Sequence, residues 1–329
     1  MIYRKTMLWL AVIVLATSCT NEDSEAVLDK PPYAAITDSL EKFPDNVSLL
    51  LRRADLLSQH DQHELANLDY RNAWKRDSSE IVAMPLISNL LLLGRHNEAI
   101  RLLETSVRKF PDNPEFRRRL SEAYFQAGRS KEAMDQYETL LQADSLNFEA
   151  WYEKALLLVE MGDTAAAIDA LARSYSLQPL TMNGLALANL YAETKNPLAV
   201  TVADDLIRKD SLASLDPFYV KGVYYSNTRQ YPQALEQFDQ CIRIDWKFTD
   251  AYIEKGIILY ELKNIDEALQ TFKMATTVSP ANPDAYYWQG RCYEAANKKD
   301  EAMDNYIRAF SLDRKFTEAK EAIERLRKQ

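Results

Sequence analysis

Residues 285–310 read AYYWQGRCYEAANKKDEAMDNYIRAF, and residues 251–276 read AYIEKGIILYELKNIDEALQTFKMAT. The two stretches begin 34 positions apart, and both have a glycine at their sixth place, an alanine at their eighteenth and an aromatic ring at their twenty-second. In each stretch, apolar residues recur every three or four positions on both sides of a polar break, which predicts two amphipathic helices joined by a turn. This helical pair therefore predicts the unit from which the fold is built.

The same spacing runs through most of the chain. Six glycines form two series with steps of 34: Gly94, Gly128 and Gly162, and then Gly222, Gly256 and Gly290. A second set marks the same period with steps of 33 or 34: Ala66, Ala99, Ala133, Ala167, Val200, Ala234, Ala268 and Ala302. The 329 residues contain only 7 glycines and 12 prolines, too few for sheet folds that turn about every 8 to 12 residues. We expect an all-α chain.

A 34-residue period with two short helices per unit resembles the tetratricopeptide repeat family. The resemblance implies a right-handed α-solenoid of stacked helix-turn-helix repeats. Counting from the clearest unit gives eight repeats within 47–316, at 47–79, 80–113, 114–147, 148–180, 181–214, 215–248, 249–282 and 283–316. A half repeat at 31–46 precedes them, and 317–329 form a capping helix with a single apolar stripe.

Recurring residues have physical reasons to recur. A glycine or alanine at the eighth position, such as Gly256, allows the two helices of a repeat to approach closely. The ring at the twenty-fourth position, such as Phe272, is expected to fill space toward the next repeat. The fifth repeat departs most, with Val200 in the alanine series, Asp204 in place of the ring and Pro197 near the start of its second helix. A bend or weaker contact is expected there.

Residues 1–30 have the sequence features of an exported protein. Arg4 and Lys5 precede ten apolar residues, Met7 to Ala16, which are too few to span a bilayer permanently and predict a signal peptide over 1–18. The ending Leu15-Ala16-Thr17-Ser18-Cys19 resembles a bacterial lipobox, which implies a lipid on Cys19 and a polar tether over 19–30. The acidic run after Cys19 resembles Bacteroidetes lipoproteins, which implies an outer-membrane address, periplasmic or surface. The alternative is an ordinary secretory signal with a chance cysteine.

Composition and motifs argue against catalysis, metals and nucleic acid. The net charge is −9, and −11 once Arg4 and Lys5 leave with the signal, so no nucleic-acid partner is expected. No phosphate loop, nucleophile elbow or paired-cysteine motif occurs, and no cofactor is expected. The histidine pair His60 and His63 lies in a polar turn and provides too few ligands for a metal site. Cys241 and Cys292, about two repeats apart, are expected to be core residues rather than a disulfide.

The first helices of stacked repeats share a stripe at their positions 2, 5, 9, 12 and 13, and the resemblance implies that this stripe forms the ligand groove. In repeats six to eight the groove is aromatic, with Asp216, Asp250 and Asp284 at its entrance. The predicted groove residues are Tyr219, Val223, Asn227, Ile253, Ile257, Tyr260, Glu261, Tyr287, Trp288, Arg291 and Glu294. Such a surface suits an extended peptide with apolar anchors and basic flanks. The alternative is that these rings pack against neighbouring helices.

One further surface and two functions remain open from the sequence. Cations gather near the second repeat boundary as Arg108, Lys109, Arg117, Arg118 and Arg119, and either bind an acidic partner or form a solvated face. The first function is a non-enzymatic, membrane-anchored scaffold for an envelope protein or peptide. The alternative is a surface lipoprotein that binds a glycan or peptide ligand directly. The sequence sets no oligomeric state.

Overall fold

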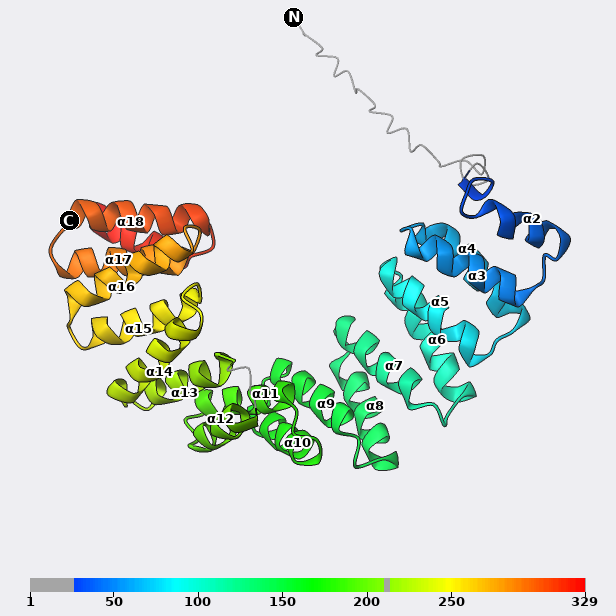
Figure 1. Ribbon diagram of the computed structural model, residues 1–329, viewed down its shortest axis with the longest axis horizontal. Helices are drawn as coiled ribbons and strands as arrows, with labels where there is room; N and C mark the ends of the chain where they lie inside the picture. The colour runs from blue at the N-terminus through cyan, green and yellow to red at the C-terminus, as the bar shows by residue number, and fades with distance from the viewer. Residues whose placement is uncertain (1–26, 210–213, 329) are drawn as a thin grey trace, which may run out of the picture. The chain divides into compact units, whose positions relative to one another are not determined.

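The computed structural model describes residues 27–209 and 214–328, and the predicted signal peptide, Cys19 and most of the tether lie outside them. Within the described residues the chain forms eighteen α-helices and no strand (Figure 1). The all-α prediction is confirmed. Across the same residues, no helix combines the length and the apolar character that crossing a membrane requires.

The chain divides into two compact units, with the boundary between Leu140 and Leu141. Unit 1 contains α2 (Ala34–Lys42), α3 (Val47–Gln59), α4 (His63–Arg76), α5 (Glu80–Leu92), α6 (His96–Lys109), α7 (Pro114–Gln126) and most of α8 (Ser130–Ala143). Unit 2 contains α9 (Phe148–Glu160), α10 (Thr164–Leu177), α11 (Thr181–Glu193), α12 (Leu198–Lys209), α13 (Asp216–Asn227), α14 (Tyr231–Ile244), α15 (Thr249–Glu261), α16 (Ile265–Val278), α17 (Pro283–Ala295), α18 (Lys299–Leu312) and α19 (Thr317–Arg327). The division therefore precedes the fifth repeat, where the sequence placed the weak point.

Helix ends follow from local side-chain chemistry. Several helices begin after an asparagine or aspartate whose side-chain oxygen accepts a backbone N–H of the first turn: Asn46, Asn113, Asn147, Asp163 and Asn282. Gly94, Gly128 and Gly162 have φ of 68°, 72° and 78°, so each ends its helix in the left-handed conformation that glycine adopts without steric cost. Five other turns place a residue with a side chain in the same conformation: Asp61, Lys195, Arg229, Lys263 and Asn297.

In the last three repeats the core is built on contact between a glycine and a ring. A β-carbon at Gly256 would lie 2.5 Å from Cε1 of Phe272, and Gly222 and Gly290 meet Phe238 and Tyr306 in the same way. Each ring covers the glycine of its own repeat. The expectation that the rings also fill space toward the next repeat is confirmed, because Phe272 belongs to a buried cluster with Ala285 and stacks on Trp288, with centroids 5.9 Å apart.

The fifth repeat keeps its packing through a shift of one residue. Ala199 and Ala203 are fully buried whereas Val200 and Asp204 are partly exposed, so Ala199, and not Val200, is the structural equivalent of the recurring alanine. The shift accompanies a different turn, because α12 begins three residues after the left-handed residue Lys195, whereas α14 and α16 begin two residues after theirs. It turns Asp204 outward, where the carboxylate forms an ion pair of 2.8 Å with Lys221 on α13.

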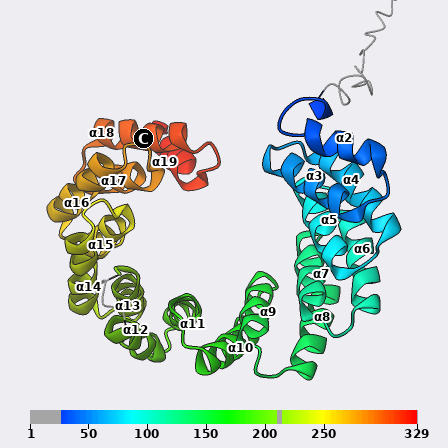
Figure 2. The ribbon, with the colours of Figure 1, turned by 45° about the vertical axis from the view of Figure 1, so that its right-hand side comes forward.

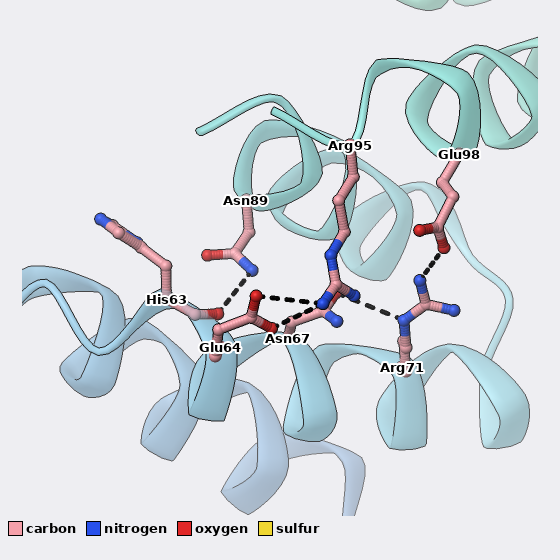
Figure 3. A network of polar contacts seen from close by, with 7 residues as sticks. All are labelled: His63, Glu64, Asn67, Arg71, Asn89, Arg95 and Glu98. Carbon is pink, nitrogen blue, oxygen red and sulfur yellow. Dashed lines mark hydrogen bonds and ion pairs between the residues drawn. The ribbon is translucent and has the colours of Figure 1, made fainter. Parts of the chain in front are cut away.

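Unit 1 uses buried polar groups as well as apolar packing. Arg53 on α3 donates two hydrogen bonds, of 2.7 and 2.8 Å, to Asp69 on α4, and both side chains are largely buried. A second network joins α4 to α6 (Figure 3). The side-chain oxygen of buried Asn67 accepts from Arg71 and Arg95, and these arginines pair with Glu98 and Glu64. Because bidentate and shared guanidinium bonds are directional, the first contact fixes the two helices of the first repeat, and the second network fixes the first repeat against the second.

Candidate binding surfaces

The predicted groove residues lie on three neighbouring helices of unit 2. Figure 2 shows α13, α15 and α17 following one another, each paired with α14, α16 or α18. Helix α13 carries Tyr219, Val223 and Asn227; α15 carries Ile253, Ile257, Tyr260 and Glu261; α17 carries Tyr287, Trp288, Arg291 and Glu294. Some of these side chains pack against the core, and others are partly exposed aromatic or polar groups.

Four predicted groove residues pack against the core. The ring of Tyr219 lies 5.8 Å from that of Phe238 and 5.2 Å from that of Phe248, measured between centroids. Burial raises the pKa of the Tyr219 hydroxyl, and the nearby carboxylates Glu254 and Asp250 raise it further. Ile253 is buried in the adjacent cluster, and Val223 and Ile257 are partly buried against these clusters. For these residues the packing alternative describes the structure.

Three predicted polar residues are engaged by neighbouring helices. Glu294 accepts a hydrogen bond of 2.7 Å from the Tyr306 hydroxyl and a bidentate contact from Arg325 of α19. Glu261 accepts from the Tyr231 hydroxyl at 2.6 Å. Asn227 donates to the backbone oxygen of Ala192 at 3.1 Å. These bonds tie successive repeats together.

The most organised part of the surface surrounds Arg291. Its guanidinium donates to the hydroxyl of Tyr287 at 3.3 Å and to that of Tyr260 at 3.4 Å. It also lies 5.4 and 5.6 Å above the rings of Tyr260 and Trp288. We call these four partly exposed residues the Arg291 cluster. Because the phenol and indole faces are held edge to face, they provide rigid aromatic surface at low entropic cost.

An acidic row runs beside this cluster. Asp216, Asp250, Asp284 and Glu318 recur at the repeat period in the first turns of α13, α15, α17 and α19, and Glu254 lies one turn further along α15. Within the described residues none of the five forms an ion pair with a basic side chain. A helix start normally stabilises a carboxylate. Nevertheless the pKa of Asp284 is raised, by burial and then by Asp250, Asp313 and Glu318.

Glu254 has the same character. Burial raises the pKa of its carboxyl group, and the charge of Asp250 raises it further. A carboxylate that is both partly desolvated and repelled by its neighbours gains free energy when a cation binds next to it. The acidic row is therefore a surface with uncompensated negative charge.

Unit 1 contains a hollow that sequence reasoning missed. It has a volume of about 900 Å³ and lies between α2, α3 and the start of α5. Its walls are Pro32, Ala35, Ile36, Val47, Ser48, Leu51, Arg52, Asp55, Leu56, Gln59, Asp77, Ile81 and Val82. Ile81 is 76% exposed. Ser48, Leu51 and Ile81 occupy groove positions 2 and 5 of their repeats, and this pattern could have indicated the hollow from the sequence. The contribution of α2 was not predictable, because α2 lies outside the repeats.

The predicted basic residues do not converge. Arg118 and Arg119 share the carboxylate of Glu115, while Arg117 donates to Gln136 on α8 at 3.0 Å. Lys109 reaches across to Ser78 and Arg108 contacts Thr105. Each cation is therefore engaged locally. The histidines behave similarly, because His60 contacts the oxygen of Leu56 and His63 contacts Ser58. No cluster of three or more metal-binding side chains occurs in the described part of the chain.

Both cysteines in the described residues are fully buried and unpaired, which confirms their placement in the core. Burial raises the pKa of each thiol to about 12. Thiols in this state are poor nucleophiles at neutral pH.

Comparisons with known proteins agree with this architecture. Two family models described as tetratricopeptide repeat match the chain, one over residues 90–145 and the other over 135–180, 219–283 and 253–311. A search of curated proteins found no significant match.

Solved structures of tetratricopeptide repeat proteins are similar in fold. One from Parabacteroides merdae has 17% identity and a TM-score of 0.60, covering 74% of this chain and 97% of its own. The C-terminal part of one from Cytophaga hutchinsonii has 16% identity and a TM-score of 0.53, covering 72% and 98%. The Cut9–Hcn1 hetero-tetramer has 15% identity and a TM-score of 0.51, covering 93% and 60%.

Proposed function

Because the chain belongs to the tetratricopeptide repeat family, we propose that it is a non-enzymatic scaffold that holds a segment of another cell-envelope protein against unit 2. A fold of stacked helix pairs suits protein or peptide binding, since it offers an extended surface rather than a closed pocket. The observation that carries the proposal is the acidic row lying beside the Arg291 cluster. One surface thus combines rigid rings with uncompensated charge.

The chemistry of this surface defines the client. Rings take apolar side chains, and the carboxylates take lysine or arginine. Neighbouring helices pack about 8–10 Å apart, and an extended strand advances about 3.3 Å per residue. Successive carboxylates of the row are therefore matched by a cation at about every third residue. The client segment is extended, basic and interrupted by apolar anchors.

We further propose that the scaffold is attached to the outer membrane through a lipid on Cys19. The support is the sequence of residues 1–25, in which a short apolar signal ends at a lipobox-like cysteine and an acidic run follows. Anchoring confines scaffold and client to one surface, which raises their effective concentration without any new contact.

The test is affinity capture of the full-length protein from native envelopes, with the bound proteins identified by mass spectrometry. The informative variant is Asp250→Lys with Asp284→Lys, because both residues are exposed and neither forms an ion pair within the described residues. Tyr219 is unsuitable, since its removal would open the core. The matched control is Asp266→Lys with Asp300→Lys, an equal charge change at exposed starts of α16 and α18.

We expect one defined envelope protein to be captured by the native chain and by the control, but not by the Asp250→Lys, Asp284→Lys variant. If the Asp250→Lys, Asp284→Lys variant keeps every partner of the native chain, the acidic row is not the client site and the proposal is wrong. If the native chain instead co-purifies with a saccharide and with no protein, the ligand-binding alternative replaces the scaffold.

A further inference from the structure

Helices α14, α16 and α18, which we call the outer helices of unit 2, carry large apolar side chains that are exposed to solvent. Ile244 and Trp246, at the end of α14 and in the loop after it, are 41% and 59% exposed. Met274 on α16 and Ile307 on α18 are 48% and 44% exposed. A single exposed apolar residue needs no explanation, but four on consecutive outer helices form a surface of a kind that marks an interaction site.

Cations surround these four side chains. They are Arg243, Lys247, Lys273, Arg308, Arg314 and Lys315, and within the described residues none of them forms an ion pair with a carboxylate. Most lie over rings instead: Lys247 over Trp246, Lys273 over Tyr293 and Arg314 over Phe310. We call the four apolar residues and six cations the outer patch.

Acids lie near the outer patch as well. Asp239 forms an ion pair of 2.6 Å with Lys255. Asp245 and Asp313 accept backbone N–H bonds from Lys247 and Lys315, at 2.9 and 2.8 Å, and keep their charges. The six cations outnumber these two carboxylates, so the patch itself is net positive on a chain whose net charge is −9, although Asp250 and Glu318 of the acidic row adjoin it.

Repeat symmetry places these residues on one face. Lys273 and Ile307 are separated by one repeat period, as are Met274 and Arg308, while Lys247 and Lys315 are two periods apart. Equivalent positions of stacked repeats face the same way, because each repeat copies the orientation of its neighbour. Helices α14, α16 and α18 succeed one another along unit 2 in Figure 1, each paired with a helix that carries the groove.

We propose that the outer patch lies on an anionic lipid bilayer. Tryptophan and aliphatic side chains enter the headgroup boundary, where an indole is favoured, while lysine and arginine reach lipid phosphates. A soluble polyanion would use the cations but not the four apolar side chains. A purely apolar partner would leave six cations unmatched. An anionic bilayer has both apolar depth and negative charge, and so matches the whole patch.

The position of the outer patch would leave the groove accessible while the protein lies on a bilayer. The outer patch and the groove are carried by different helices of each pair, so contact with the bilayer leaves α13, α15 and α17 available to a client. The outer patch attracts the bilayer by itself, whether or not Cys19 carries lipid.

The experiment uses the chain from residue 19 onward with Cys19→Ser, so that no lipid is attached, and co-sedimentation with vesicles. One set is pure phosphatidylcholine and the other contains one quarter phosphatidylglycerol. We expect binding to the anionic vesicles at low salt and about tenfold weaker binding to the neutral ones. Ile244→Ser with Trp246→Ser, and separately Lys247→Glu with Arg314→Glu, should each reduce anionic binding at least fivefold.

The matched control is Leu262→Ser with Lys263→Glu, because Leu262 is 43% exposed and adjoins a lysine in the turn after α15, away from the patch. This control should bind as the parent does. Circular dichroism verifies that every variant is folded. The proposal is overturned if the parent binds neither vesicle, if the control loses as much binding as the patch variants, or if only the charge variant loses binding, which would indicate a polyanion site.

Discussion

Gly256 on α15 lies directly against Phe272 on α16, so closely that a β-carbon at residue 256 would lie 2.5 Å from the ring. Alanine normally favours a helix over glycine by about 1 kcal/mol. Here we expect Gly256→Ala to destabilise unit 2 by about 1–3 kcal/mol, because the ring is fully buried and has no room to retreat. The measurement is the midpoint of urea unfolding followed by circular dichroism.

Phe272→Leu combined with Gly256→Ala is the control for this mechanism. If the clash with the ring causes the loss, the double variant is more stable than the sum of the two single changes predicts. Strict additivity would show that Gly256 acts through something other than the ring.

Lys263 and Gly94 occupy corresponding turns, with φ of 65° and 68°. A side chain in this left-handed conformation costs about 1–2 kcal/mol, which glycine avoids at the expense of greater freedom in the unfolded chain. We therefore expect Lys263→Gly to stabilise the protein by about 0.5–1 kcal/mol in thermal or urea unfolding. Lys273→Gly, inside α16, is the matched change and should cost about 1 kcal/mol.

The acidic row predicts an unusual dependence on pH. The folded-state pKa values of Glu254 and Asp284 are raised, so the folded state holds these protons more tightly than the unfolded state does. Their cost to stability is absent below the ordinary carboxyl pKa and appears as pH rises through the raised values. We expect Glu254→Gln with Asp284→Asn to stabilise the protein at neutral pH and to have little effect in acid, as measured by unfolding across pH.

Asp205 provides the opposite case for comparison. Lys209 and then Tyr175 lower the pKa of its carboxyl group to about 2. Its contribution is present above the ordinary pKa and is lost as pH falls through the lowered value. Asp205→Asn should therefore destabilise at neutral pH, with a loss that shrinks in acid when unfolding is measured across the same pH range.

The acidic row also predicts how client binding depends on pH. Glu254 and Asp284 should lose affinity for a lysine-rich peptide as they become protonated, because the neutral carboxyl groups no longer attract its cations. The measurement is peptide affinity by calorimetry at several pH values. Affinity that rises in acid would contradict the proposed groove.

The two buried thiols report on the integrity of unit 2. Because Cys241 and Cys292 have no exposed surface and their pKa values are about 12, we expect no reaction with a thiol-specific reagent at mildly alkaline pH in the native protein. Reaction should begin at the urea concentration at which unit 2 unfolds. Rapid labelling of both thiols without urea would show that α14 and α17 open in the native state.

Much of the fold was predictable because the same physical requirement recurs in successive repeats. The spacing of Gly222, Gly256 and Gly290 located the helix crossings, and the left-handed caps at Gly94, Gly128 and Gly162 followed from the chemistry of glycine. What repetition does not encode was missed. The shift that replaces Val200 by Ala199 accompanies a change in the turn after Lys195, which a fixed period conceals.

The site was less predictable, since exposure is decided by neighbours far away in sequence. Helical position placed Tyr219 and Tyr260 on the same stripe, yet Phe238 and Phe248 cover the first whereas Arg291 holds the second at the surface. The hollow beside α2 depends on a half repeat that follows no period.

The pairing of each glycine with a ring of its own repeat has an evolutionary consequence. Since Gly256 and Phe272 belong to one repeat unit, a duplication or deletion of that length within the last three repeats leaves every glycine opposite a ring. This part of the gene can therefore lengthen or shorten by whole units without separating any glycine from the ring that covers it.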